Sequence, residues 1–269
     1  MGARTPSNAV LARLPREKAI PRLLKLHGDR FYALARRLCG NTADAEDLVQ
    51  EIFLQAWRKW QQFQGRSNVT TWLYTIAARA CRRMHRKRAG QGHSLSLDAL
   101  SPFNEPQVSV LPGNGDGPAA RQVREEAASR LMAALAQLPA EFRLPVLFKD
   151  IFGLSLAQTA EVLEVKEATV KTRLHRARLR LRKALTESLP KRKGPPPAYA
   201  KRVCMDLLQA KQDALDHGRR FPVGDEIVCE RCRSVFASLE MTQNLCGGMA
   251  DGRMPASFLR ELLDKLRES

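Results

Sequence analysis

Residues 153–185, GLSLAQTAEVLEVKEATVKTRLHRARLRLRKAL, are the stretch that decides the fold. Their periodicity predicts a short helix over 155–163, a turn at 164–166 and a second helix from residue 167 onward. Two helices joined by so short a turn have the proportions of a helix-turn-helix, and the alternative is an ordinary basic, solvated helix. Apolar residues of the second helix recur at spacings of four, three and four, and should face a core: Val170, Leu174, Ala177 and Leu181.

The outer face of this second helix is polar and basic near its start. A recognition helix offers such side chains to base edges and phosphates in the major groove. The whole chain has 45 Lys and Arg against 28 Asp and Glu, a formal net charge of +17, which favours an extended polyanion such as nucleic acid as the partner. The candidate DNA-binding residues of this helix are Lys171, Thr172, Arg173 and Arg176.

Residues 14–88 also show helical periodicity. Gly40 is a helix stop, and Asn41 or Thr42 can cap a new helix that begins TADAEDLVQEIFLQAWRKW, residues 42–60. Asp44 and Glu46 suit the first turn, where acids favour the helix dipole. Three polar residues lie deeper in the helix and indicate a protein partner: Asp47, Gln50 and Glu51.

A third helix, TWLYTIAARACRRMHRKR (71–88), begins apolar and ends basic. The tryptophans at 57, 60 and 72 have helical spacing, so we expect them in the core. A polar loop beside a cationic helix suits a single nucleic-acid strand, with the loop at the bases and the helix at the phosphates. The candidate residues are Gln64, Gly65, Arg66, Ser67 and Asn68 in the loop and Arg79, Arg82, Arg83 and Arg86 in the helix.

Composition divides the chain into three globular pieces. Gly, Pro, Ser and Asn are frequent over 89–120, and 190–202 is proline-rich and basic, so both segments read as linkers. The predicted fold class is all-α, with helical modules at 14–88 and 121–189 and a small helical domain at 203–269. The chain lacks a run of about 18 apolar residues and a signal peptide, which predicts a soluble, cytoplasmic protein without a membrane partner.

Two blocks of the sequence resemble a known family in order and spacing. DAEDLVQEIFLQAW, followed by WLYTIA and a basic tail, resembles region 2 of the bacterial extracytoplasmic-function (ECF) sigma factors. LPAEFRLPVLFKDIFGLSLAQTAEVLEVKEATVKTRLHRARLRLRK resembles their region 4. The resemblance covers most of residues 14–189 and implies a transcription initiation factor rather than an enzyme.

The resemblance implies roles for the candidate residues. Asp47, Gln50 and Glu51 would dock on core RNA polymerase, and the loop at 63–69 would capture a base of the melted −10 promoter strand. The helix-turn-helix would read the −35 element, with Thr169 added to the residues named above. The alternative is a helix-turn-helix regulator that binds duplex DNA without polymerase, although such a protein needs neither the acidic patch nor the linker.

Some positions depart from the family pattern. The pattern usually reads Ile-Ala-Arg-Asn where this chain has Ile-Ala-Ala-Arg at 76–79, and an acid is expected where Arg83 stands. Both changes add positive charge beside the DNA. At the turn, the frequent Gly-Val-Ser is Glu-Val-Lys at 164–166, so a left-handed glycine is either not required or replaced under strain.

The third piece contains thiols with metal-ligand spacing. Cys204, Cys229 and Cys232 with His217 supply enough ligands for a tetrahedral zinc site. CMDLLQAKQDALDHG and VCERCRSVFASLE resemble a zinc-binding anti-sigma domain, in which Asp225 would take the position of a histidine ligand. A redox switch and an inert packed remnant are the alternatives. A thiol oxidoreductase is disfavoured because no βαβ pattern surrounds the pair.

The last segment, ASFLRELLDKLRES (256–269), has one apolar stripe at helical spacing. We expect residues 203–269 to bind the sigma modules of the same chain and hold them away from polymerase or DNA, with this segment as a clasp. Positive regulation, in which the metal-bound domain supports promoter binding, is equally allowed. The alternative is that the helix packs on its own small domain. A short tether would raise the effective concentration of the interface to roughly millimolar, so even a weak contact would be mostly closed.

Overall fold

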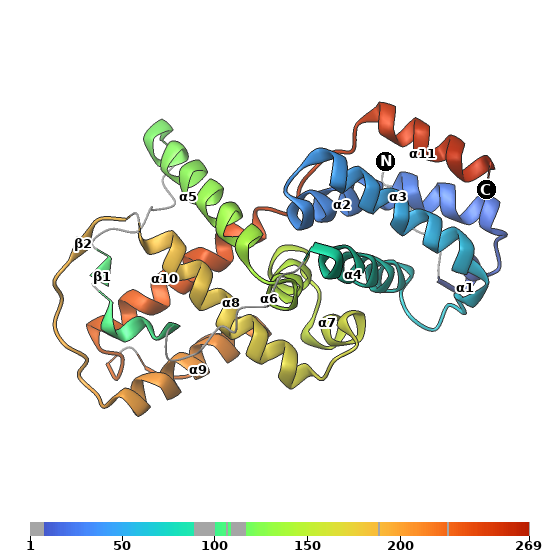
Figure 1. Ribbon diagram of the computed structural model, residues 1–269. Coiled ribbons are helices and arrows are strands. Elements are labelled where there is room, and N and C mark those ends of the chain that lie inside the picture. The colour runs from blue at the N-terminus through green and yellow to red at the C-terminus, as the bar shows by residue number, and fades with distance from the viewer. Residues whose placement is uncertain are drawn as a thin grey trace. The chain divides into compact units, whose positions relative to one another are not determined.

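The computed structural model describes residues 8–88, 100–105, 107–108, 117–187, 189–224 and 226–268. The predicted all-α class is confirmed, since helices form most of this part of the chain (Figure 1). The longer helices are α2 (Arg16–Cys39), α3 (Thr42–Lys59), α4 (Val69–Arg88), α5 (Pro118–Gln137), α8 (Glu167–Glu187), α9 (Lys201–His217), α10 (Glu230–Gly247) and α11 (Ala256–Glu268). The shorter ones are α1 (Asn8–Ala12), η1 (Trp60–Gln62), η3 (Pro102–Asn104), α6 (Ala140–Val146), the π-helical η4 (Leu147–Ile151) and α7 (Leu156–Leu163).

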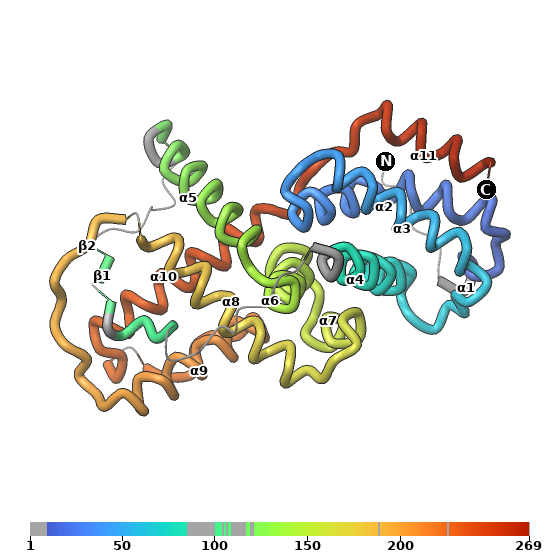
Figure 2. The backbone as a smooth tube through the Cα atoms, in the orientation of Figure 1, coloured from blue at the N-terminus to red at the C-terminus, as the bar shows by residue number. Residues whose placement is uncertain are grey.

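The chain forms two compact units that do not follow its order in sequence. Unit 1 comprises residues 1–91, 157–165 and 250–269, and unit 2 comprises residues 92–156 and 166–249. The backbone trace in Figure 2 shows the C-terminal end returning beside the N-terminal helices of unit 1. Among the described residues, none of the helices is both long and apolar enough to cross a membrane.

Unit 1 is built on α2, α3 and α4. The Gly40 stop is confirmed, because this residue takes φ 79°, a left-handed conformation that glycine favours. Asn41 caps α3, and its side chain accepts a hydrogen bond of 2.9 Å from the backbone N–H of Asp44. The Phe31 ring joins the helices, with centroids 5.9 Å from Phe53 and 5.0 Å from Tyr74.

The tryptophans belong to this packing, as their spacing predicts. Trp57 and Trp60 are buried, and Trp72 is half-buried with its ring 5.8 Å from that of Trp60. The indole N–H of Trp60 donates to the carbonyl of Leu14 at 2.8 Å, so its polar group is satisfied within the fold. These rings therefore support the loop that follows α3.

The helix-turn-helix boundaries match the prediction. α7 ends at Leu163, the turn covers residues 164–166, and α8 begins at Glu167. The four apolar residues that should face a core are all buried: Val170, Leu174, Ala177 and Leu181. The period of the sequence thus sets which face of α8 points inward.

Unit 2 joins residues 121–156 and 166–187 to residues that the sequence places in a separate domain. One hydrophobic cluster contains Leu179 of α8 together with Cys204, Phe236 and Leu239 of α9 and α10. Leu100 and Phe103, from the segment expected to be a linker, lie in the same cluster. The two short strands, β1 (Gln107–Val108) and β2 (Lys191–Arg192), pair antiparallel and join the two expected linkers.

A buried ion-pair network fixes this arrangement. The guanidinium of Arg178 on α8 donates to Asp150 of η4 at 2.9 and 2.7 Å and to Asp216 of α9 at 2.5 Å. Arg178 is 2% exposed, and the two carboxylates raise its pKa against the opposing effect of burial. Burial works to raise the pKa of Asp216, but hydrogen bonds and charges from His175 and Arg178 outweigh it and lower the pKa.

Removal of Arg178 should therefore destabilise unit 2 strongly. Arg178→Met keeps much of the side-chain volume but leaves two buried carboxylates without their cation, which costs roughly 3–5 kcal/mol. Arg180→Met is the matched control, since Arg180 is exposed on the same helix and should change stability by less than about 0.5 kcal/mol. Urea unfolding of the full chain measures both. Similar losses from the two variants would contradict the structural role of Arg178.

Candidate polymerase and promoter interfaces

The outer face of α8 presents its basic residues close to acidic side chains of unit 2. Lys171 lies 3.6 Å from Asp213 of α9, and Arg173 lies 3.3 Å from Glu141 of α6. Thr172 is exposed, and its hydroxyl donates to the carbonyl of Ala168 at 2.9 Å. Thr169 and Arg176, both half-buried, complete the predicted set on this helix. The two paired cations are thus held by carboxylates of the same chain.

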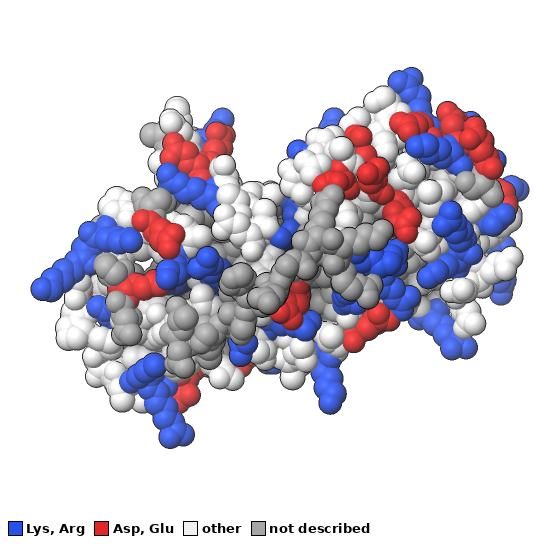
Figure 3. All heavy atoms as spheres, viewed as in Figure 1, with Lys and Arg blue, Asp and Glu red and all other residues white. Residues whose placement is uncertain are grey.

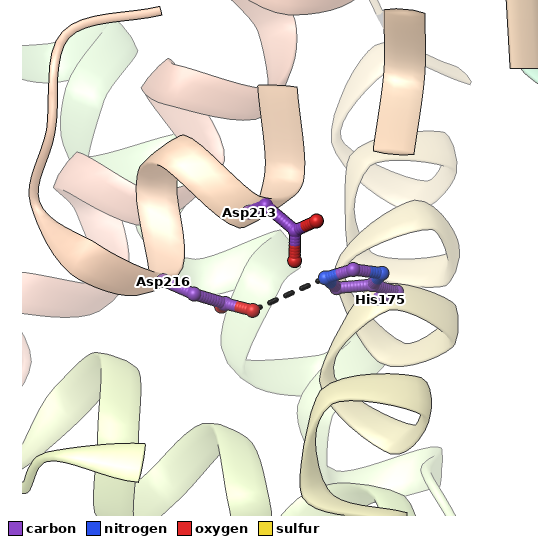
Figure 4. A group of neighbouring side chains, drawn as sticks. All are labelled: His175, Asp213 and Asp216. Carbon is purple, nitrogen blue, oxygen red and sulfur yellow. Dashed lines mark hydrogen bonds and ion pairs between the residues drawn. The ribbon is translucent and has the colours of Figure 1, made fainter. Parts of the chain in front are cut away.

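A group of side chains with metal-ligand chemistry lies under this face (Figure 4). The Nε2 atom of His175 is 3.1 Å from Asp216, and the ligand atoms of these two residues and Asp213 lie within 4.8 Å of one another. Among the described residues this is the one such group. Arg178 and Lys171 pair with the same carboxylates and supply two positive charges. The geometry is therefore that of an ion-pair network that joins α8 to α9.

The predicted polymerase-binding patch lies along α3. Asp47 is exposed, whereas Gln50 and Glu51 are half-buried. The Glu51 carboxylate accepts from Arg83 of α4 at 2.9 Å, so the arginine that replaces an expected acid pairs with the acidic patch itself. The amide oxygen of Gln50 accepts from Lys265 of α11 at 2.9 Å.

The predicted base-binding loop follows the aromatic cluster. Gly65 has φ 71°, and Gln64, Arg66 and Asn68 are exposed. The Asn68 side chain accepts from both the backbone N–H and the hydroxyl of Thr70, at 3.0 and 2.8 Å. Asn68 therefore caps α4, which holds the loop at the start of the basic helix.

The basic residues of α4 contact the end of α7 within unit 1. Both Arg79 and Arg82 pair with Glu164, and Arg82 also donates to the carbonyl of Leu163. The hydrogen bond from Arg79 lowers the pKa of Glu164 against the opposing effect of burial, and the charges of both arginines lower it further. The side chain of Arg86 lies outside the described residues. On the face shown in Figure 3, acidic side chains accordingly lie among the basic ones.

Two of the predicted thiol ligands stand at the start of α10, and the third, Cys204 of α9, lies in the same hydrophobic cluster as Cys232. Burial, followed by the neighbouring thiols of Cys229 and Cys204, raises the pKa of Cys232. Burial acts to raise the pKa of Cys229, but hydrogen bonds from the backbone and from Cys232 outweigh it and lower the pKa. His217 donates from Nδ1 to the carbonyl of Asp213 at 2.7 Å, while Asp225 lies outside the described residues.

Comparison with known proteins identifies both helical modules. Residues 23–91 match the Sigma-70 region 2 family, and residues 128–181 match the Sigma-70 region 4 family. The chain is 30% identical over 171 residues to ECF RNA polymerase sigma factor SigW of Bacillus subtilis, a match that covers 64% of this chain and 91% of that protein. The chain belongs to the ECF RNA polymerase sigma factors.

Two further relatives are also ECF RNA polymerase sigma factors. SigE of Mycolicibacterium smegmatis is 37% identical over 165 residues, which cover 61% of each chain, and SigM of Mycobacterium tuberculosis is 34% identical over 167 residues, which cover 62% of this chain and 77% of that one. In this sigma factor, region 2 contains the acidic patch, the loop and the basic helix, and region 4 contains the helix-turn-helix. A regulator that works without polymerase is not favoured, because the relatives are RNA polymerase sigma factors.

The sequence does not predict the roles of several residues that shape these surfaces. Arg178 lies in a basic run and was indistinguishable from its exposed neighbours except for its place beside Ala177 on the buried face. Asp150 and Asp216 are distant from it in sequence, so local patterns give no sign of the pairing. The sequence marks Glu164 as an unusual residue for the turn but gives no sign of its arginine partners.

Arg173 offers a test of the recognition helix. If its side chain reads a base, Arg173→Ala should weaken promoter binding by roughly 1–3 kcal/mol and relax the preference at one position of the −35 element. Glu141→Gln should instead strengthen binding slightly, because it releases the same guanidinium from its ion pair. A selection of −35 sequences with both variants measures this. A uniform loss across all sequences would reassign Arg173 to a phosphate.

Proposed function

We propose that this sigma factor binds core RNA polymerase through the α3 patch and opens promoters in the bacterial cytoplasm. On this proposal the loop at 64–68 and α4 bind the melted −10 strand, and α8 binds the −35 element. The factor makes no chemical bond itself. It favours the open promoter because it binds melted DNA better than duplex, and a ligand shifts an equilibrium only through that difference.

We further propose that its C-terminal residues regulate it, with α11 as an internal inhibitor of polymerase binding. α11 packs against α2 and α3, and in Figure 1 it runs along these helices. Phe258, Leu262 and Leu266 of α11 are buried, and the Phe258 ring lies 6.3 Å from that of Tyr32. The expected apolar stripe thus faces region 2, which supports the clasp over packing on its own domain.

The segment 250–255, which leads into α11, is hydrogen-bonded to α2. The Arg37 guanidinium donates to the carbonyl of Asp251 at 2.8 Å, and the backbone N–H of Met254 donates to Asp29 at 2.9 Å. A Cβ at Gly28 would stand 2.4 Å from the terminal carbon of Met254, so the methionine occupies the notch that this glycine leaves in α2. The docking is therefore specific in position as well as apolar.

The observation that carries the proposal is the hydrogen bond between Lys265 and Gln50. Gln50 is one of the three residues that the family resemblance assigns to polymerase docking, and α11 occupies it in this structure. Polymerase and α11 would compete for the same part of α3. A clasp of this kind keeps the factor inactive until a signal, or polymerase itself, displaces the helix.

Transcription from a promoter with core RNA polymerase tests the proposal. A chain that ends at residue 249, and the variant Leu262→Asp, should both be more active than the full chain, because each removes α11 from α3. Ser257→Asp is the matched control, since it adds the same charge at an exposed position of α11. Truncation at 249 is more informative than truncation at 189, which would also remove Asp216 from Arg178.

The outcomes separate the two parts of the proposal. Absence of specific transcripts from every version, at any concentration of polymerase, would contradict the initiation function. Equal activity of the full chain, the shortened chain and Leu262→Asp would contradict inhibition by α11 and leave the initiation function standing.

We also propose that Cys204, Cys229 and Cys232 hold a zinc ion, with a thiol-based redox switch as the alternative. Zinc binds thiolates, and the lowered pKa of Cys229 at the start of α10 supplies one. Cys229 and Cys232 have the spacing at which a Cys-x-x-Cys pair binds one metal, and Cys204 lies in the same cluster, so three sulfur ligands would leave the fourth position open to another group. Bound metal would tie α9 to α10 at a cluster that also contains Leu179 of the recognition helix.

Metal content checks this proposal. The purified chain should contain about one zinc per molecule, and Cys229→Ser with Cys232→Ser should lose it and melt at a lower temperature. Cys246→Ser is the matched control, since Cys246 is a buried thiol of α10 that is not one of the three candidate ligands. If the wild-type chain holds no metal under reducing conditions and forms a disulfide on oxidation, the redox alternative replaces zinc.

A further inference from the structure

Unit 1 also contains an ionic contact between α4 and the end of α7, in which residues 203–269 take no part. The Arg79 guanidinium of α4 donates to both carboxylate oxygens of Glu164, with Nε at 3.3 Å and Nη2 at 2.5 Å. Arg82, one turn along the same helix, donates to the carbonyl of Leu163 at 2.5 Å and lies 3.8 Å from the Glu164 carboxylate. Two arginines of α4, the helix proposed to bind the −10 strand and called the −10 helix below, therefore contact the last residue of α7 and the first residue of the turn.

The backbone of Glu164 is unusual for its residue type. Its φ is 55°, and among the described residues it is the one non-glycine with a positive φ. This left-handed conformation is unfavourable for a side chain with a Cβ, so glycine is the ordinary choice at such a turn. Retention of a glutamate at a strained position points to a use for its carboxylate, an inference that runs from the observed outlier to function.

The groups that the arginines meet have the chemistry of a DNA backbone. A carboxylate offers two anionic oxygens to the fork of Arg79, as a phosphate does. The Leu163 carbonyl belongs to the C-terminal end of α7, where the helix dipole is negative and carbonyls lack helical partners. Together they place acceptor oxygens and negative charge where the promoter strand would place its phosphates.

We propose that Glu164 is a stand-in for a DNA phosphate, which latches the helix-turn-helix turn onto the −10 helix until promoter DNA displaces it. The proposal rests on the assignment of Arg79 and Arg82 to DNA, which belongs to the proposed function. It does not depend on α11 or on the thiols.

The strength of the latch suits a reversible contact. The side chains of Arg79 and Glu164 are 46% and 47% exposed, and pairs this exposed shift an equilibrium by roughly fivefold at most. A promoter strand offers several phosphates at once and gains from the release of counterions, so it can outcompete one carboxylate. The latch would raise the threshold for DNA binding without blocking it.

The test compares two glutamates of the same chain. Glu164→Gln and Glu161→Gln each remove one negative charge, but Glu161 is an exposed residue of α7. We expect Glu164→Gln to raise the affinity for a single-stranded −10 oligonucleotide by roughly two- to fivefold at low salt, and Glu161→Gln to leave it nearly unchanged. Equal effects of the two variants would overturn the proposal, since they would reflect net charge alone.

Glu164→Gly separates the latch from a structural role of the side chain. Glycine relieves the positive φ, so the thermal midpoint should stay the same or rise while the oligonucleotide affinity rises as it does in Glu164→Gln. A fall in the midpoint without a gain in affinity would mean that Glu164 serves the turn rather than the arginines, and would overturn the proposal.

Hydrogen exchange tests the latch without DNA or polymerase. Backbone amides over residues 157–163 should exchange faster in Glu164→Gln and in Arg79→Gln, and the double variant should exchange no faster than either single one, because both break the same contact. Additive effects would contradict a shared contact.

Faster exchange without a gain in DNA affinity would show that the contact exists but does not compete with DNA, and it would overturn the role of phosphate stand-in. If hydrogen exchange and oligonucleotide affinity change as expected but every variant lacks promoter activity, the proposed function is contradicted and the latch is not.

Discussion

The arrangement of unit 2 depends on one buried cation. Arg178 lies between Asp150 and Asp216, at 2% exposure, and so ties the recognition helix to the π-helical turn before it and to α9 after it. A buried guanidinium needs compensating negative charge, and the two carboxylates supply it, while His175 hydrogen-bonds to one of them, Asp216. The orientation of α8 is thereby fixed on its inner side, while Lys171 and Arg173 remain at the edge. Residues 201–217 are consequently part of the support of region 4.

Much of this fold follows from the sequence. Local periodicity determines the helix-turn-helix, the inward face of α8 and the Gly40 stop, because each depends on residues within one or two turns of one another. The candidate α3 patch and the basic face of α4 follow in the same way. What each of these surfaces touches could not be predicted, since Gln50 meets a lysine far along the chain and Arg79 meets a glutamate of another module.

The C-terminal third shows the limit most clearly. Composition suggested one small domain at 203–269, but its cysteine-containing helices share a core with Leu179 of α8, and α11 packs on α2 and α3. The cysteine-containing helices and α11 each have an apolar stripe at helical spacing. Such a stripe predicts which face of a helix is buried, but it does not predict which element covers that face. The spacing of the thiols predicts a metal site, and this stays a prediction. His217, which lies between the cysteines in sequence, hydrogen-bonds to the Asp213 carbonyl.

The strength of each contact separates permanent joints from reversible ones. Arg178 is buried, so its removal strands two carboxylates in a medium where charge is costly, and DNA cannot reach it as a competitor. Arg79, Arg83, Lys171 and Arg173 pair instead with carboxylates at partly exposed positions, where each pair contributes about 1 kcal/mol or less. Salt screens such pairs and a polyanion can replace them one by one. A chain with a formal charge of +17 can thus keep the cations that we predict to bind DNA paired at rest and still release them to a promoter.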